Sequence, residues 1–212
     1  MPECGNISKV GVHAIDKASR RTAQRINTRE RVFNAAIAEF QRVGMAHADV
    51  GAIAAAAGIA RGTFYFHFPS KEDVLLELTR REEVLIGAEM HTASEEYVDL
   101  EAVLTEMIRR VVAAEGRLGA TLFRDVLSFY FSTTQPGAVD PANHPLTEVV
   151  ADHIKRARGR GDVYPDVDPM SSATFFLLGL YALLATNRRP KQARAAMLKK
   201  YVRSVMHGLV RY

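Results

Sequence analysis

The chain has 212 residues, of which 28 are Lys or Arg and 24 are Asp or Glu, so its net charge is +4. A single cysteine, Cys4, excludes a disulfide framework within one chain and fits a reducing compartment. Residues 1–23 lack the apolar core of a secretory signal, and the longest apolar run, Ala173 to Thr186, is shorter than the roughly 20 residues of a membrane span. We therefore expect a cytoplasmic protein without a membrane-spanning segment.

The positive charge is concentrated at the front of the chain. Residues 1–71 contain ten Lys or Arg and five Asp or Glu, a net charge of +5, which leaves −1 for the rest. A basic front on a near-neutral body is typical of a nucleic-acid-binding head. A solvated basic surface that binds no nucleic acid would have the same excess of Lys and Arg. Sequence motifs are therefore needed to distinguish these two interpretations.

The first segment, residues 1–24, is expected to be a flexible basic arm. Its Arg20, Arg21 and Arg25 would suit phosphate or minor-groove contacts, and a tail that contacts nothing remains an equal alternative. A helix should follow, with Asn27 and Glu30 as a capping box and Gly44 as its stop. Its apolar stripe has helical spacing and consists of Phe33, Ala36, Ile37 and Phe40.

A second short helix is predicted to begin at Asp49, which can cap it. Small alanines allow this helix to pack closely, and Gly58 supplies the positive φ of a sharp turn. Its inward face is expected to contain Val50, Ile53, Ala54 and Ala57.

The third helix, Arg61 to Phe68, should bury Phe64 and Phe68, which are i, i+4 neighbours. Two short helices joined by a glycine turn form the arrangement that places one helix in the DNA major groove. Pro69 ends the helix, and Ser70 with Asp73 resembles a capping box for the next one.

The residues left facing outward have the chemistry of a groove-reading helix. An arginine can fork to guanine or phosphate, a glycine permits close approach, and a threonine offers a hydroxyl and a methyl group. Tyrosine, histidine and lysine suit phosphate contacts, which fix the register without reading sequence. The predicted DNA-binding residues are Arg61, Gly62, Thr63, Tyr65, His67 and Lys71.

The run GIARGTFYFHFPSKEDVL, residues 58–75, closely resembles the signature of TetR-family transcriptional regulators. The similarity extends over about residues 27–78, and GRGDVYPDVDP, residues 159–169, resembles the junction before the last two helices of that family. Two positions depart from the family pattern. Ala60 stands where a capping Ser or Thr is common, and Asp49 stands where a phosphate-touching Thr is common, so Asp49 is assigned only a capping role.

The resemblance implies an all-α protein of about nine helices, with a three-helix helix-turn-helix DNA-binding domain and a C-terminal helical ligand-binding and dimerisation domain. The expected domains are residues 1–24, 25–71 and 72–212. Further helices are predicted at residues 71–92, 100–115, 119–132, 146–158, 169–187 and 190–209, with loops at 135–145 and 159–168.

The helix at residues 169–187 is apolar almost all round, so neighbouring helices and a partner subunit would have to cover it. The resemblance implies a homodimer formed by the last two helices, with Leu177 at the interface. An ordinary core helix of a monomer remains the alternative.

Apolar side chains in the C-terminal region would line a cavity, with His91, Asp125 or Asn187 as polar anchors. The alternative is that these side chains simply fill the core. The resemblance implies an effector site for an unidentified small molecule, and the aromatic and Met content of this region favours a lipophilic one. The predicted ligand-binding residues are Met90, Met107, Phe123, Leu127, Phe131 and Phe175.

The sequence thus predicts a DNA-binding regulator, a repressor released from an inverted-repeat operator by a small effector. An activator or an effector-independent DNA-binding dimer of the same fold would share these features. An enzyme is disfavoured because the chain has no Gly-rich phosphate loop, no Gly-x-Ser-x-Gly elbow and no metal-spaced His/Cys set. No catalytic residue, metal or cofactor is expected.

Overall fold

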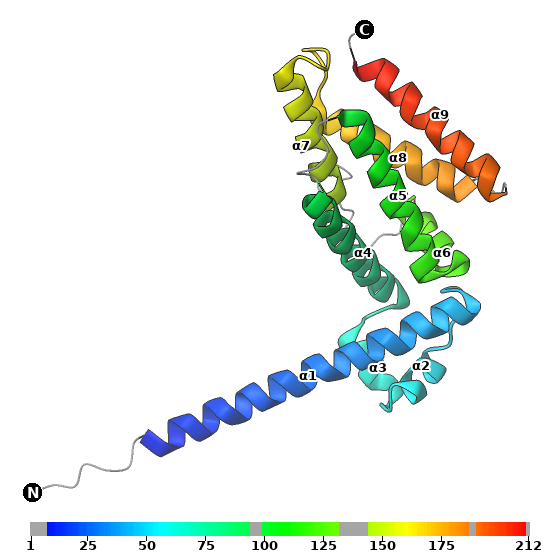
Figure 1. Ribbon diagram of the computed structural model, residues 1–212. Coiled ribbons are helices and arrows are strands. Elements are labelled where there is room, and N and C mark those ends of the chain that lie inside the picture. Colours follow the sequence, from blue (N-terminus) through cyan, green and yellow to red (C-terminus); the bar gives the residue numbers. More distant parts are fainter. Residues whose placement is uncertain (1–7, 94–98, 132–143, 187–189, 211–212) are drawn as a thin grey trace, which may run out of the picture. The chain divides into compact units, whose positions relative to one another are not determined.

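The computed structural model describes residues 8–93, 99–131, 144–186 and 190–210 (Figure 1). The regular elements in these ranges are nine helices, and one isolated antiparallel bridge joins Val163 to Val210. The predicted all-α class is therefore confirmed. The chain divides into two compact units, Met1–Val74 and Leu75–Tyr212, called unit 1 and unit 2 below.

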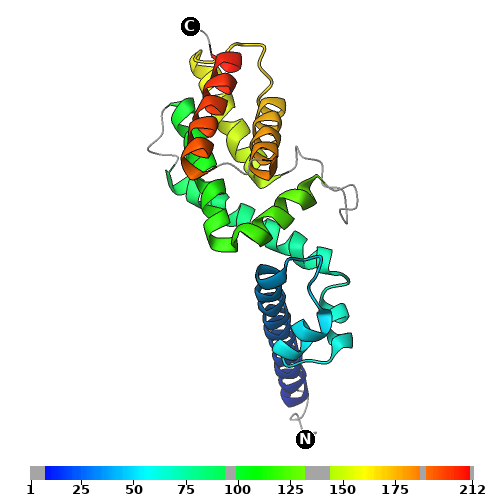
Figure 2. The ribbon, with the colours of Figure 1, turned by 90° about the vertical axis from the view of Figure 1, so that its right-hand side faces the viewer.

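Unit 1 contains α1 (Ser8–Val43), α2 (Val50–Ala56), α3 (Arg61–His67) and the start of α4 (Lys71–Ala93). The helices α2 and α3 pack against the C-terminal half of α1, while its N-terminal half extends past them (Figures 1 and 2). The fully buried side chains of this core include Val32, Ala36, Phe40, Ile53, Phe64, Phe68 and Val74.

The local signals between α1 and α3 form as predicted. The Asp49 carboxylate accepts hydrogen bonds from the amides of Gly51 and Ala52 at 3.0 and 3.1 Å. Gly44 and Gly58 have φ angles of 81° and 64°, in the left-handed region that glycine tolerates best. These two turns set the path of α2 between the longer helix and α3.

The prediction of a flexible arm over residues 1–24 is wrong from Ser8 onward, where α1 begins, and residues 1–7 lie outside the described ranges. Residues 12–43 contain neither Gly nor Pro, so nothing in this stretch interrupts a helix. The proposed capping box at Asn27 and Glu30 lies inside α1 for the same reason. A capping pattern marks a helix start only where the preceding backbone is not helical.

Unit 2 contains the rest of α4, α5 (Leu100–Leu118), α6 (Ala120–Tyr130), α7 (Pro145–Arg160), α8 (Pro169–Thr186) and α9 (Lys191–Leu209). The helix α7 packs along α8, and α5 contacts α6, α7 and α9 (Figure 2). Ion pairs join α4 to α5, with Arg117 at 2.7 Å from Glu82 and Arg110 at 2.7 Å from Glu89.

Several helix boundaries in unit 2 differ from the predicted ones. The helix α5 continues past Gly116 to Leu118, and α7 continues past Gly159 to Arg160, where Gly161 with a φ of 84° caps it. Pro145 is the first residue of α7, a position that needs no amide donor, although it was assigned to a loop. The rest of that predicted loop falls mainly outside the described residues. Packing therefore overrides the weak helix preference of a single glycine.

The helix α8 is long and apolar enough to cross a membrane by length and composition alone, with a mean hydropathy of 1.4 over its 18 residues. The helix packs on the other helices of unit 2, and a core helix satisfies the same test. Its buried residues are Ala173, Phe176, Leu177, Leu180, Tyr181 and Leu184.

A close contact joins α8 to α9. The Tyr201 ring stacks on Phe176 with centroids 5.7 Å apart, and the Tyr201 hydroxyl donates to the Phe176 carbonyl oxygen at 2.6 Å. Gly179 faces the same ring, and a Cβ at this position would fall inside the contact distance of the Tyr201 hydroxyl. The absence of a side chain at Gly179 therefore permits this contact.

We predict that Gly179→Ala destabilises the protein by about 1–3 kcal/mol, because the ring must shift and its hydrogen bond is strained. The matched control is Gly116→Ala in α5, where an added Cβ meets no atom within 4 Å. This control should stabilise the protein by about 0.5–1 kcal/mol through helix propensity. Thermal unfolding of both variants measures the effect, and equal shifts would contradict the contact.

Candidate nucleic-acid interface and ligand cavities

The orientation of α3 is set by two buried rings. Phe64 and Phe68 are 0% and 1% exposed, and their ring centroids lie 6.2 Å apart. Phe68 also meets Phe33 of α1 at 6.3 Å, and the Arg29 guanidinium lies 4.4 Å above the Phe68 ring. The predicted inward face of α3 is confirmed, which leaves the opposite face for solvent.

The structure places five of the six predicted DNA-binding residues on α3. Arg61, Gly62 and Tyr65 are exposed, and Thr63 and His67 are half-buried. An added Cβ at Gly62 would meet no atom within 4 Å, so the backbone there is open to close approach. This face offers a guanidinium, a hydroxyl and a phenol within two helical turns.

Phe66 was not among the predicted DNA-binding residues. Its side chain is 71% exposed near the C-terminal end of α3. Its ring meets His67 edge-on at 5.2 Å. The signal was available in the sequence. Three consecutive aromatic residues on a helix cannot all face one core, because neighbouring positions differ by about 100°. The surface of α3 is thus more apolar than predicted.

His67 carries little charge at neutral pH. Burial lowers its pKa from the ordinary 6.5, and the positive charges of Arg29 and Arg25 lower it further. A neutral imidazole can still donate a hydrogen bond but attracts a phosphate less strongly than an imidazolium. The charge of this face therefore comes from arginine.

Lys71 does not have the surroundings expected of a phosphate contact. Its ammonium donates to the carbonyl oxygens of Met45, Ala46 and Ala48 at 2.7, 3.2 and 3.2 Å, which uses all three donors within unit 1. Lys71 thereby ties the chain between α1 and α2 to the start of α4. The adjacent Ser70 caps α4 as predicted, because its hydroxyl accepts from the amide of Asp73 at 3.2 Å.

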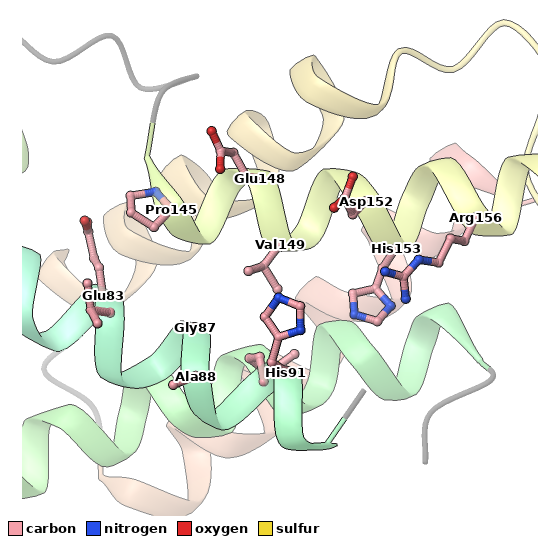
Figure 3. A pocket seen from close by; sticks show the side chains of 12 residues that line it. Glu83, Gly87, Ala88, His91, Pro145, Glu148, Val149, Asp152, His153 and Arg156 are labelled. Carbon is pink, nitrogen blue, oxygen red and sulfur yellow. The ribbon is translucent and has the colours of Figure 1, made fainter. Parts of the chain in front are cut away.

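A cavity of about 260 Å³ lies between α4 and α7 in unit 2. Figure 3 shows His91 of α4 and His153 of α7 on its two walls. Burial and then the nearby Arg156 lower the pKa of His153. The lining contains three carboxylates and one arginine, namely Glu83, Glu148, Asp152 and Arg156.

A second cavity of about 40 Å³ is almost entirely apolar. Glu83 belongs to the lining of both cavities. The other residues that line this second cavity come from α4, α5, α6, α7 and α8. They include Ile86, Val111, Phe123, Leu127, Tyr130, Leu146 and Tyr181.

The six predicted ligand-binding residues are not brought together. Phe123 and Leu127 line the smaller cavity, and Met90 lines the larger one. Met107 is fully buried in the core, whereas Phe131 and Phe175 are 49% and 71% exposed. Composition identifies apolar residues but not their rotation about the helix axis, which decides whether they face a cavity.

Of the predicted polar anchors, His91 lines the larger cavity. Asp125 lies on α6 with a half-buried side chain. Asn187 lies outside the described residues.

Sequence reasoning missed Glu83, which is 4% exposed. One carboxylate oxygen lies 2.9 Å from Nδ1 of His144, and the other, Oε2, has no hydrogen-bond partner in the described parts of the chain. Glu83 comes four residues after Thr79 and three before Ile86, both on the inner face of α4. A charge at helical spacing within an apolar stripe was the available signal.

Tyrosine rings flank this carboxylate. The Tyr130 ring lies 5.2 Å from the His144 ring and 4.7 Å from that of Tyr181. Burial raises the pKa of Tyr181 far above its usual value, and the negative charge of Glu83 raises it further. The Tyr181 phenol is therefore neutral beside this buried acid.

A glycine turn joins α2 to α3, and the face of α3 opposite to Phe64 and Phe68 is exposed to solvent. This arrangement is that of a helix-turn-helix DNA-binding domain. Residues 32–78 match the family described as bacterial regulatory proteins, tetR family. The Escherichia coli K12 regulator UidR is 24% identical over 184 residues, which cover 86% of this chain and 93% of UidR. AcrR of Shigella flexneri is 36% identical over 70 residues, covering 32% of this chain and 33% of AcrR.

The fold of the whole chain gives the same assignment. The TetR-family repressor FadR of Thermus thermophilus, solved with lauroyl-CoA, is similar at a TM-score of 0.66 and 26% identity, over 87% of this chain and 96% of FadR. Unit 1 thus carries the DNA-binding region of the tetR family, and over most of its length the chain is similar to TetR-family transcriptional regulators. Its relatives are regulators rather than enzymes, which agrees with the sequence prediction.

We predict that Lys71→Met destabilises unit 1 by about 1.5–3 kcal/mol, the range for hydrogen bonds to a charged group. The variant keeps the aliphatic stem but leaves three carbonyl oxygens without their donor. Arg61→Met is the matched control, because Arg61 is exposed on α3 and should leave stability unchanged. Denaturant unfolding measures both variants, and equal stabilities would assign Lys71 to the surface instead.

Proposed function

We propose that the protein is a cytoplasmic repressor that binds an inverted-repeat operator as a homodimer and releases it when a small lipophilic effector binds in unit 2. The observation that carries this proposal is the outward face of α3, held in place by the buried rings of Phe64 and Phe68. Proposed base contacts come from Arg61, with Gly62 and Thr63 at the groove surface. Tyr65 and His67 are proposed phosphate contacts.

The dimer is supported by the exposed side of α8. Phe175 is 71% exposed on the side of α8 opposite to its buried residues. A large apolar side chain exposed there favours a partner surface, here the same helices of a second subunit. Leu177, expected at this interface, is only 3% exposed and belongs to the core of its own subunit.

Two-fold pairing would make DNA binding tight. One short helix touches few phosphates, so a single unit 1 would bind weakly and with strong salt dependence. Joining two such units raises the effective concentration of the second one at its half-site. The dimer is therefore part of the proposed binding mechanism.

The effector response is supported by the cavities beside α4. This helix continues without interruption from Lys71 in unit 1 to Ala93 in unit 2, so a shift around Glu83 acts on a covalently continuous element. An effector can change operator affinity only by its differential affinity for the two states. Typical coupling of ~1–3 kcal/mol corresponds to a roughly 5–150-fold change. The acyl chain of the lauroyl-CoA bound by FadR fits the proposal of a partly apolar effector.

The proposal is tested by selecting bound duplexes from a random DNA pool at low ionic strength. We expect an inverted repeat whose half-site centres are separated by about 10 base pairs or a multiple of that. Adding purified effector candidates to the bound complex then tests release. Failure to enrich any inverted repeat would rule out the operator-binding proposal.

We predict that Arg61→Ala changes the ranking of operator variants, costing about 1–3 kcal/mol at the base it contacts. Tyr65→Phe should instead weaken binding to all sequences by a similar factor, because its hydroxyl is proposed to hold a phosphate. Titrations of the selected operator and single-base variants measure both effects. A uniform loss for Arg61→Ala would move this residue to the backbone-contact class.

We predict that Phe175→Asp converts the dimer to monomers and reduces operator affinity, since a charge would be buried in the proposed interface. Phe131→Asp is the matched control, because Phe131 is an equally large exposed aromatic residue at the end of α6. Analytical ultracentrifugation gives the oligomeric state of each variant. A Phe175→Asp protein that sediments as the unaltered chain does would exclude α8 from the interface.

A further inference from the structure

The unpartnered oxygen of Glu83 is the least satisfied group in the described core. A carboxylate oxygen that is removed from water and lacks a donor is unfavourable, and buried acids normally have partners for both oxygens. Here Oε1 has His144, whereas Oε2 is buried with no partner among the described residues. A donor group of a bound ligand would complete the hydrogen bonding of Oε2 among these residues.

Two features near Glu83 favour a positively charged donor over a neutral one. The wall of the larger cavity carries three carboxylates against the single guanidinium of Arg156. Tyr130 and Tyr181 line the smaller cavity together with Glu83, and aromatic rings attract cations. Both effects are strengthened where water is excluded.

The surroundings also specify an apolar body for the ligand. Glu83 lines the smaller cavity too, whose other walls include Phe123, Leu127 and Leu146. At about 40 Å³ this cavity is narrow, so a slender chain is a better fit than a broad ring system. A group bonded to Oε2 would have its apolar part beside these side chains.

We propose that the effector is a lipophilic amine, whose protonated nitrogen donates to Glu83 Oε2 and whose hydrocarbon chain lies against Phe123 and Leu127. This inference rests on the proposed effector site and names the chemical class that the site recognises. Glu83 is the residue that determines this specificity. The lauroyl-CoA bound by FadR is an anion. The effector proposed for this chain is a cation, so the two proteins differ in the charge of the ligand that they bind.

The test compares octylamine, octanol and octanoate, three probes with the same chain length and different head groups. At pH 7 the amine is protonated and the acid is ionised, as their ordinary pKa values require. Isothermal titration calorimetry and thermal shift are measured on the full chain without DNA. We expect octylammonium to bind about 10-fold or more tightly than either other probe.

Two variants separate the buried acid from general attraction to the acidic rim. Glu83→Gln has nearly the same shape and should remove the preference for the amine while leaving octanol binding unchanged. Glu148→Gln is the matched control, because Glu148 lines the larger cavity with an exposed side chain, and it should keep the preference. Equal effects of the two variants would overturn the role of Glu83.

A ranking in which octanol or octanoate binds as tightly as octylammonium overturns the proposal, and that ranking decides it even if Glu83→Gln fails to fold. The result is distinguishable from failure of the proposed function. A protein that selects an inverted repeat but prefers octanoate keeps the regulator proposal and loses the amine. A protein that prefers octylammonium but selects no operator keeps the amine site and loses the operator.

Discussion

Burial of the Phe64 and Phe68 rings is the packing interaction on which the DNA-binding face depends. The two rings are one helical turn apart, so together they set the rotation of α3 about its axis. A change of one position in that register would turn the helix by about 100° and bring different side chains to the surface. The short helix α2 supports this arrangement, because it packs against both α1 and α3 and buries Val50, Ile53 and Ala54.

The two units use charge in different ways. In unit 1 the Arg29 guanidinium lies over the Phe68 ring, and Lys71 bridges carbonyl oxygens rather than remaining available to a partner. In unit 2 the charge that matters is buried, because Glu83 lies among apolar and aromatic side chains and one of its carboxylate oxygens has no partner in the described ranges. A charged side chain on the surface keeps its hydration, so it has little effect on stability. A buried charge loses its hydration and is tolerated only where hydrogen bonds or an opposite charge compensate that loss.

Local chemistry explains which sequence predictions held. Asp49, Gly58 and Ser70 act on backbone groups within three residues of themselves, and each forms the cap or turn that the sequence indicated. Predictions that needed the position of a distant segment were less successful. Met107 and Phe175 are both apolar, yet one is in the core and the other is exposed, because their positions on the helix face different surroundings.

The sequence by itself determined the all-α class, most helix boundaries, the inward face of α3 and the resemblance to TetR regulators, because periodicity, caps and turn glycines are encoded over a few residues. Only the tertiary structure decided that Lys71 serves the fold, that α1 begins near Ser8, and that Glu83 meets His144 from a segment 61 positions away. Such pairings depend on how helices pack, and packing depends on the shapes of many side chains at once rather than on any local pattern.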